Sequence, residues 1–211
     1  MIEGNDLGLA MHTASAQLGL AKGDSSRDIV ARVWDLGTKL SSDFHDRLAE
    51  FVYPLSWSAL QFLAVAIGPG GFTSTRIGVV AARTLAQQLD IPLYGLSTLA
   101  AAAWRQRQQA PVGHWLAVQM PARRGELHGG IYEVTAAGLV THLGDRVFSP
   151  ELWQSTIAQQ PTPCTLIEAG DDLGQDAIAL LQLARQAWAA GDRPHWSAVL
   201  PHYGQHPVDR S

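Results

Sequence analysis

A glycine-rich turn between a buried strand and an amphipathic helix is the feature that most constrains this chain. The apolar run over 62–67 predicts a buried strand, and apolar residues at helical spacing predict a helix over about 73–90. Between them stands Gly68-Pro69-Gly70-Gly71-Phe72-Thr73. Glycine adopts backbone angles that other residues disfavour, and a helix N-terminus presents unpaired N–H groups that attract anions. The turn therefore suits either a phosphate group or close packing of the chain.

Two known phosphate-binding signatures can be tested at this turn. A P-loop needs Lys and then Ser or Thr directly after its last glycine, whereas Gly71 is followed by Phe72 and Thr73. A dinucleotide fingerprint needs a third glycine where Thr73 stands. Because both signatures fail, we favour a structural turn over a nucleotide site. If the turn did bind a ligand, the residues in contact with it would be Gly68, Gly70, Gly71, Thr73 and Arg76.

Composition excludes several classes of protein. Hydrophobic residues make up 46% of the 211 residues and charged residues 16%, which is typical of a folded globular chain of one large domain or two lobes. The net charge is -4, so direct binding to tRNA or DNA is disfavoured. The single cysteine, Cys164, permits no internal disulfide and lies in an apolar run, as an inert core thiol would. Acidic residues near the N-terminus and the lack of a membrane-length apolar run lead us to expect a soluble, cytoplasmic protein.

The order of predicted elements indicates two lobes. Three strands lead the chain, over 7–12, 18–22 and 29–34, and helices and strands then alternate. Residues 1–109 therefore form a first lobe with the order β-β-β-α-β-α-β-α, and 110–211 form a second with β-β-β-α-β-α and an extended tail, which we expect to pack back on a lobe. Such an order predicts an α/β fold with mixed sheets flanked by helices.

Two amphipathic helices of the first lobe are the candidates for binding a partner. One carries Phe44, Leu48, Phe51, Val52 and Leu55, and the other carries Ile77, Val80, Ala81, Leu85 and Leu89. Two such helices side by side would supply the apolar centre that a stable interface needs. Replacing Leu48 or Phe51 by Asp is expected to abolish partner binding while the free fold survives.

No set of polar residues forms a recognisable active site. His45 fits a solvated helix face better than a metal site, because no further ligands stand at metal-binding spacing. Asp171 and Asp172 could hold magnesium, although we prefer a role in capping the next helix. Arg123 and Glu126 fit an exposed turn or, less well, a contact to a ligand. We therefore predict no catalytic residue and no metal site.

Three segments together resemble one known family. They are Gly68-Pro69-Gly70-Gly71-Phe72-Thr73-Ser74-Thr75-Arg76-Ile77-Gly78, Pro92-Leu93-Tyr94-Gly95-Leu96-Ser97-Thr98-Leu99 and Ala122-Arg123-Arg124-Gly125-Glu126-Leu127. In this order they look like the motifs of the TsaB (YeaZ) family. The resemblance covers most of the chain from Leu7 onward.

The resemblance implies a two-lobed actin/Hsp70-like fold of the ASKHA, ribonuclease H-like type. It also implies a part in making N6-threonylcarbamoyladenosine at position 37 of tRNA, as the non-catalytic partner of a TsaD transferase. A TsaE-like ATPase would join the pair, a homodimer would form through the helices of the first lobe, and tRNA would be bound only through the complex. No cofactor of the chain's own is implied, and ATP or ADP would bind only at an interface shared with a partner.

The chain departs from the family pattern at residues that would handle phosphate. His12 stands where the family has Asp after the first strand, Gly71 replaces Ser, Ser74 replaces Gly, and Pro121 replaces Asp. These changes weaken the alternative function, an ATP-binding kinase or ATPase of the same fold that would use the glycine turn with Asp171 or Asp172. They do not affect the apolar helices.

Overall fold

The computed structural model describes residues 6–25 and 28–202, and the chain divides into two compact units. Within these residues, unit 1 contains the chain up to Thr98 together with Asp171–Pro201, and unit 2 contains Leu99–Gly170 and His202. The fold is α/β with one mixed sheet in each unit, as the sequence predicts. The division differs in two ways from the predicted break between residues 109 and 110: unit 2 already begins at Leu99, and the chain returns to unit 1 after Gly170.

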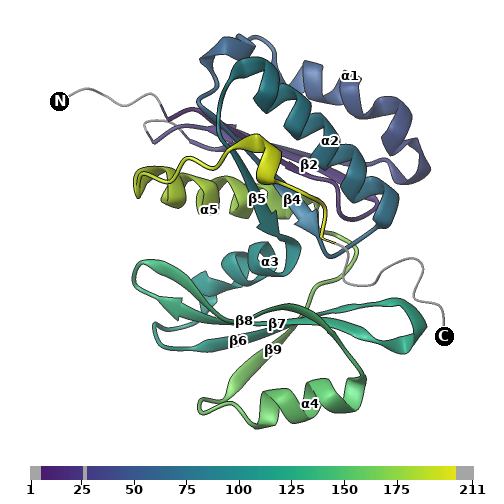
Figure 1. Ribbon diagram of the computed structural model, residues 1–211, viewed down its shortest axis with the longest axis vertical. Helices are drawn as coiled ribbons and strands as arrows, with labels where there is room; N and C mark the ends of the chain where they lie inside the picture. The colour runs from purple at the N-terminus through teal and green to yellow at the C-terminus, as the bar shows by residue number, and fades with distance from the viewer. Residues whose placement is uncertain (1–5, 26–27, 203–211) are drawn as a thin grey trace. The chain divides into compact units, whose positions relative to one another are not determined.

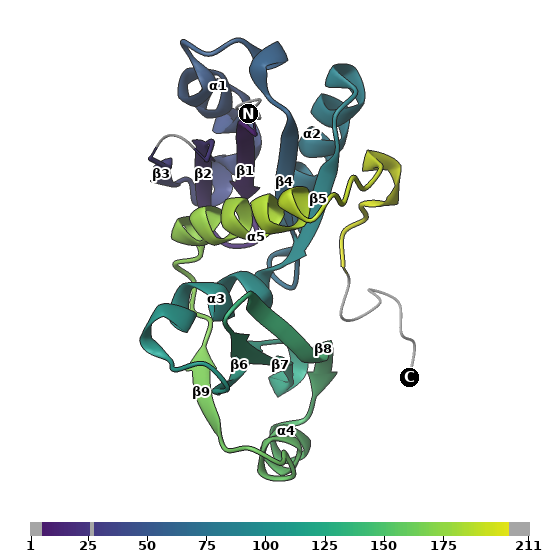
Figure 2. The same cartoon turned by 90° about the vertical axis from the view of Figure 1, so that its left-hand side faces the viewer.

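Unit 1 is built on a five-stranded sheet of order β3-β2-β1-β4-β5. Its strands are β1 (Gly8–His12), β2 (Gln17–Gly23), β3 (Val30–Asp35), β4 (Phe62–Gly68) and β5 (Leu93–Ser97). β1 pairs antiparallel with β2 and β2 with β3, whereas β1, β4 and β5 are parallel. Figure 2 shows the five strands in this order from left to right. The order and directions are those of the predicted ribonuclease H-like fold.

Three helices cover the two faces of this sheet. α1 (Leu40–Val52) and α2 (Phe72–Leu89) lie on one face, and α5 (Ala177–Ala189) lies on the other (Figure 1). On the first face, alternate strand residues such as Leu9, Leu20 and Leu63 are fully buried with the apolar stripes of α1 and α2. Each crossover helix returns the chain to the start of the next parallel strand, so α1 and α2 run in the same direction.

Small residues on the opposite face let α5 and the turn before it approach closely. A Cβ on Gly8 would lie 2.8 Å from a methyl of Leu181 in α5, and a Cβ on Gly19 would lie 1.8 Å from the carbonyl oxygen of Gly174. The space left by these glycines allows α5 to pack against β1, β2 and β4. They explain why α5, which follows the second sheet in the sequence, belongs to the first unit.

The described part of the tail packs on unit 1, as expected. The amide of Leu93 donates to the carbonyl of Pro194 at 3.3 Å, and Val199 lies against the bare Cα of Gly95. Trp196 faces the guanidinium of Arg83 on α2, 5.9 Å from the ring centre. Tyr203 and Pro207, which the sequence also assigns to the tail, lie outside the described residues.

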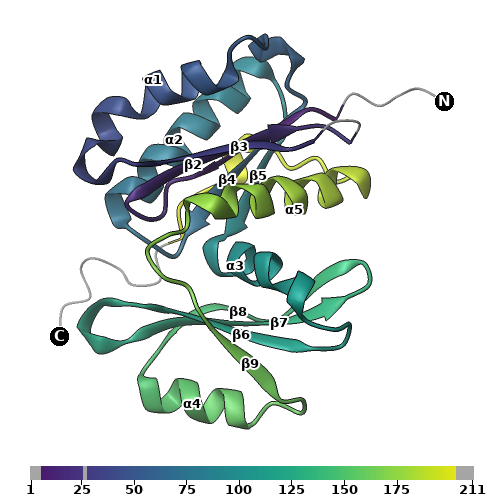
Figure 3. The same ribbon diagram turned by 180° about the vertical axis from the view of Figure 1, so that it is seen from behind.

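Unit 2 contains a four-stranded sheet of order β8-β7-β6-β9. Its strands are β6 (Trp115–Pro121), β7 (Leu127–Thr135), β8 (Gly138–Phe148) and β9 (Cys164–Glu168). α3 (Thr98–Gln106) leads into the unit, and α4 (Pro150–Ala158) lies along one face of the sheet (Figure 3). Trp153 of α4 is buried there between Phe148 and the backbone of Gly129.

Candidate functional site

The glycine turn of unit 1 packs against the loop that follows β1. The amide of Gly71 donates to the carbonyl of Ala14 at 2.7 Å. Gly70 has φ of 156°, and a Cβ there would lie 2.2 Å from the same carbonyl oxygen. A Cβ on Gly78, in the second turn of α2, would lie 2.2 Å from the hydroxyl oxygen of Thr13. Close approach of two chain segments therefore explains these glycines without a ligand.

A groove of about 590 Å³ lies on unit 1 between α1 and α2. α1 contributes Ser41, His45, Leu48 and Ala49. α2 contributes Thr73, Arg76, Ile77, Val80, Ala81, Thr84 and Leu85. The indole of Trp57, in the turn after α1, closes the wall. We refer to this set as the α1/α2 groove.

The α1/α2 groove is apolar because of the residues at its floor and centre. Leu48 is buried and forms part of the floor, and the small side chains of Ala49 and Ala81 leave space above it. Val80 is 62% exposed and lines the groove from α2. An exposed apolar surface between two helices is a common place for the apolar face of another protein to dock.

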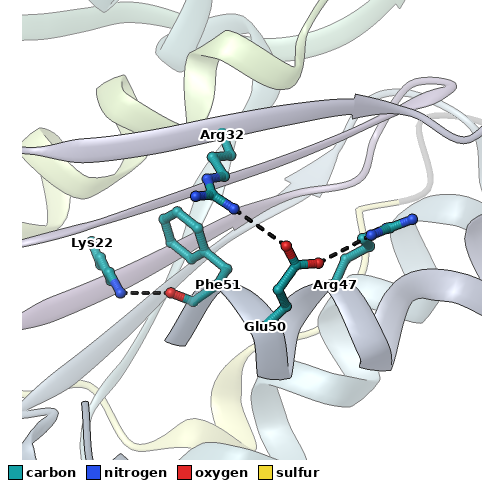
Figure 4. Close-up of polar contacts among 5 residues, drawn as sticks. All are labelled: Lys22, Arg32, Arg47, Glu50 and Phe51. Atoms are coloured by element: carbon teal, nitrogen blue, oxygen red, sulfur yellow. Dashed lines mark hydrogen bonds and ion pairs between the residues drawn. The ribbon is translucent and has the colours of Figure 1, made fainter. Parts of the chain in front are cut away.

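Polar contacts join α1 to β2 and β3 (Figure 4). The ammonium group of Lys22 donates to the carbonyls of Phe51 and Val52, at 2.5 and 3.3 Å. These carbonyls end α1 and have no partner within the helix. Glu50 bridges Arg32 of β3 and Arg47 of α1, at 3.4 and 3.0 Å. Burial and the neighbouring Arg32 lower the pKa of Lys22 from its ordinary value.

The predicted interface residues divide into two sets. Five of them line the α1/α2 groove: Leu48, Ile77, Val80, Ala81 and Leu85. The other five do not line it: Phe44, Phe51, Val52, Leu55 and Leu89. Phe44, Phe51 and Val52 are at most 3% exposed and form the core beneath α1, and Leu55 is half-buried against that core.

The burial of these residues corrects the test suggested by the sequence. Leu48 and Phe51 are 4% and 3% exposed, so Asp at either position would place a carboxylate in the core. A buried unpaired charge costs several kcal/mol, on the order of a domain's whole stability. Neither variant therefore separates loss of binding from loss of the fold.

Sequence analysis missed part of the groove. Its polar members Ser41 and His45 and its small members Ala49 and Thr84 lie beside the apolar stripes of the helices, not within them. They could have been identified from two features of the sequence. They lie on the helix surface next to the buried apolar stripe, and the small residues Ala49 and Ala81 leave space there. His45 is exposed, and its ring meets Phe44 edge-on at 5.3 Å.

The other candidate ligand contacts are distributed between the two units. Gly68, Gly70, Gly71, Thr73 and Arg76 belong to unit 1, whereas Arg123 and Glu126 belong to unit 2. Arg123 is exposed and begins a tight turn between β6 and β7, in which the amide of Glu126 donates to its carbonyl at 3.2 Å. His12 ends β1 and is fully buried.

The acidic pair does not cap α5. Asp171 and Asp172 are exposed, and a single turn of 3-10 helix separates them from α5. Asp172 accepts a hydrogen bond from the side-chain Nε2 of Gln17 at 3.2 Å, and that nitrogen also donates to Asp35 at 2.8 Å. Among residues 6–25 and 28–202, no cluster of three or more His, Cys, Asp or Glu side chains is arranged to hold a metal ion.

Cys164 is half-buried at the start of β9, where burial raises the pKa of its thiol. A raised pKa leaves less reactive thiolate, as predicted for an inert thiol, but the prediction that Cys164 lies in the core is wrong because β9 is largely exposed. Within the described part of the chain, no helix combines the length and apolar character that a membrane span requires.

Comparison with known proteins gives a consistent family. Residues 49–177, more than half of the chain, match the family model described as TsaD, tRNA N6-adenosine threonylcarbamoyltransferase. The tRNA threonylcarbamoyladenosine biosynthesis protein TsaB of Bacillus subtilis (strain 168) is 40% identical over 122 residues, which cover 56% of this chain and 51% of that protein. The chain thus spans about half the length of this relative.

Two further similarities cover more of the chain. The protein of the same name from Escherichia coli (strain K12) is 27% identical over 178 residues, which cover 81% of this chain and 70% of that protein. The solved structure of YeaZ from Pseudomonas aeruginosa superposes with a TM-score of 0.72 at 22% identity, covering 94% of this chain and 99% of that one. The latter similarity shows a shared fold. From the family model and these relatives, the chain belongs to the TsaB (YeaZ) family, within the group of proteins that the TsaD model describes.

Proposed function

We propose that this chain is a non-catalytic, TsaB-like subunit required for N6-threonylcarbamoyladenosine modification of tRNA, and that it binds and supports a TsaD-like transferase. The family supports the pathway, because the relatives carry the name of threonylcarbamoyladenosine biosynthesis proteins. The observation that carries the binding role is the α1/α2 groove, with Val80 exposed at its centre.

The residues of the chain favour binding over catalysis. Glycines 70 and 78 are accounted for by contacts with Ala14 and Thr13, so the turn needs no phosphate to explain it. His12 occupies the position of the carboxylate expected in a phosphate-handling member of the fold, and it is fully buried. We therefore propose that the chemistry, and any ATP or ADP, belong to the partner or to a surface shared with it.

The groove would also serve self-association. A second copy of the chain presents the same apolar surface, and in the absence of the transferase it would cover the groove as a homodimer. Participation of a TsaE-like ATPase, and contact with tRNA through the complex, remain predictions from the family resemblance.

The proposed function is tested by modified-nucleoside analysis in a strain that lacks the gene. We expect N6-threonylcarbamoyladenosine in bulk tRNA to fall in the deletion strain and to return when the parent chain is expressed. Val80→Asp should not restore it, although the variant accumulates normally, because an exposed valine can be replaced with little effect on folding.

Val112→Asp is the matched control, because Val112 is 69% exposed and lies in unit 2, outside the groove. This variant should restore the nucleoside fully. An unchanged nucleoside level in the deletion strain would exclude the proposed pathway. Restoration by Val80→Asp would exclude the groove as the essential surface.

A further inference from the structure

β3 forms one edge of the unit 1 sheet and is largely exposed along its length. It pairs with β2 on one side, and among residues 6–25 and 28–202 no strand lies on its other side (Figure 2). Val30 is 50% exposed and Val33 is 42% exposed. An open strand edge is a template for pairing with another strand.

The hydrogen bonds around β2 show which backbone groups of β3 point outward. The amide of Leu36 donates to the carbonyl of Ala16 at 3.3 Å, whereas the amide of Gln17, in the next pair, donates to the hydroxyl of Ser15 at 3.2 Å. Bonded and non-bonded pairs alternate along an antiparallel ladder, so the even-numbered residues of β3 bond to β2. The backbone N–H and C=O groups of the other three residues point away from β2: Ala31, Val33 and Asp35.

We propose that this edge pairs, antiparallel, with the β3 edge of a second copy of the chain about a two-fold axis at Val33. Outward groups of both copies meet only if the axis passes through a residue and not between two. An axis at Arg32 aligns residues 30–34 and an axis at Val33 aligns 31–35, whereas any other residue of the strand aligns fewer.

Charge decides between these two axes. An axis at Arg32 would set two guanidinium groups directly opposite each other, which is unfavourable. An axis at Val33 sets this valine against its own copy, and the outward groups of the two strands then form about six hydrogen bonds.

The side chains around β3 also fit this pairing. On the α1 face, Arg32 would lie opposite Trp34 of the second copy, and a guanidinium is attracted to an indole ring. Glu50 pairs with Arg32 at 3.4 Å and reduces the repulsion between the two copies of this arginine (Figure 4). Antiparallel pairing also sets the end of β3 that leads to Lys39 beside the end that follows Asp28, and these exposed residues have opposite charges.

The helices of unit 1 leave room for the second copy. α1 packs closer to β2 than to β3, and Lys22 of β2 bonds to its last carbonyls. The β2 strands of the two copies would lie three strand spacings apart, about 14 Å, whereas packed helices need only about 8–10 Å. Glu50 faces β3 while Leu48 and Ala49 line the groove, so pairing at β3 leaves the α1/α2 groove open.

The test places charges at the proposed axis and follows sedimentation of the full chain over a range of protein concentrations. Every protein carries Val80→Asp, so that association through the groove does not contribute. Val33→Lys and Val33→Glu each set like charges opposite one another, so each alone should self-associate roughly fivefold or more weakly than the reference chain. An equal mixture of the two should recover association, because opposite charges then meet at the axis. Val112→Lys, at a 69% exposed valine of unit 2, is the control and should match the reference.

Amide hydrogen exchange tests the backbone pairing in the reference chain, without a substitution at the edge. The amides of Ala31 and Val33 should exchange more slowly as the protein concentration rises, whereas that of Arg32, bonded to β2, should be protected at every concentration. Exchange independent of concentration at Ala31 and Val33 would overturn the proposal. So would a reference chain that stays monomeric, or mixed variants that melt as the reference does but fail to associate. If Val33→Lys instead loses binding to the transferase and keeps its self-association, the edge belongs to that partner and not to a second copy.

Discussion

Replacing Gly78 by Ala tests whether the glycine turn exists for close packing. Alanine is the better helix former by about 1 kcal/mol, so the substitution should stabilise α2 if space were available. The new Cβ, however, would lie 2.2 Å from the hydroxyl oxygen of Thr13 and 3.2 Å from its methyl. Rotation of the Thr13 side chain gives only part of the relief, because the Cβ of Thr13 itself would remain 3.3 Å from the new Cβ.

The backbone near Thr13 is also unable to retreat easily. The next carbonyl, that of Ala14, accepts a hydrogen bond from Gly71 and lies against the Cα of Gly70. Overpacking of a closed core typically costs about 1–3 kcal/mol. Because a contact of 2.2 Å is severe, the cost should lie in the upper half of that range, about 2–3 kcal/mol. Subtracting the gain in helix propensity of about 1 kcal/mol, we expect Gly78→Ala to lower the free energy of unfolding by about 1–2 kcal/mol.

A double-mutant cycle with Thr13→Ala isolates the contact. Thr13 is fully buried, and within the described residues its hydroxyl has no hydrogen-bond partner, so Thr13→Ala alone should have a small effect. The double variant should be more stable than Gly78→Ala, with a coupling energy of about 1–3 kcal/mol in urea unfolding. Gly144→Ala, where a Cβ meets nothing within 4 Å, is the control. A Gly78→Ala protein as stable as the parent, or a coupling energy near zero, would refute the packing explanation.

Two further predictions concern stability. Lys22→Met removes the donor to the carbonyls of Phe51 and Val52, so urea unfolding should show a loss of about 1–2 kcal/mol. Lys39→Met, at an exposed lysine, should show almost none, and equal losses would argue against the capping role. Burial lowers the pKa of His128 below its ordinary value of 6.5, so the unfolded chain takes up the proton first on acidification. Stability should therefore decrease as the pH falls below about 6.5, and His128→Gln should flatten this decrease in thermal melts; an unchanged slope would contradict the assignment.

The sequence predicted the order of elements well because each element has a clear local pattern. The strand over 62–67 and the helix after it were recognisable from apolar spacing and from the glycines between them. The reason for Gly78 was not recognisable, since the residue that excludes a side chain there is Thr13, 65 positions earlier in the sequence. Long-range contacts of this kind have no local signal.

The interface was predicted less accurately because an apolar stripe does not reveal what covers it. On α1, the stripe of Phe44, Phe51 and Val52 faces the unit's own sheet, as most apolar helix faces do. On α2, the buried residues are instead Gly78, Val79, Ala82 and Ala86, and Val80 is left exposed. Two stripes on one helix can be distinguished only when the position of the sheet is known.

The placement of α5 shows that local sequence patterns also cannot assign a whole helix to its unit. The helical pattern of α5 is clear in the sequence, and its place after β9 assigned it to the second lobe. Its actual site is set by the small residues on β1 and β2, where Gly8 and Gly19 leave room for α5 and for the turn before it. Glycine in a strand indicates a close neighbour but does not say which segment that neighbour is.

The central claim is that the α1/α2 groove binds a TsaD-like transferase, and the affinity of that pair tests it most directly. Titration of the purified transferase with the parent chain, Val80→Asp and Val112→Asp compares two valines of similar exposure, 62% and 69%. A charge buried at the centre of an interface costs about 2 kcal/mol or more, so Val80→Asp should weaken binding at least roughly 30-fold. Val112→Asp should match the parent. Equal affinities for all three proteins, with all three folded, would contradict the assignment of this surface.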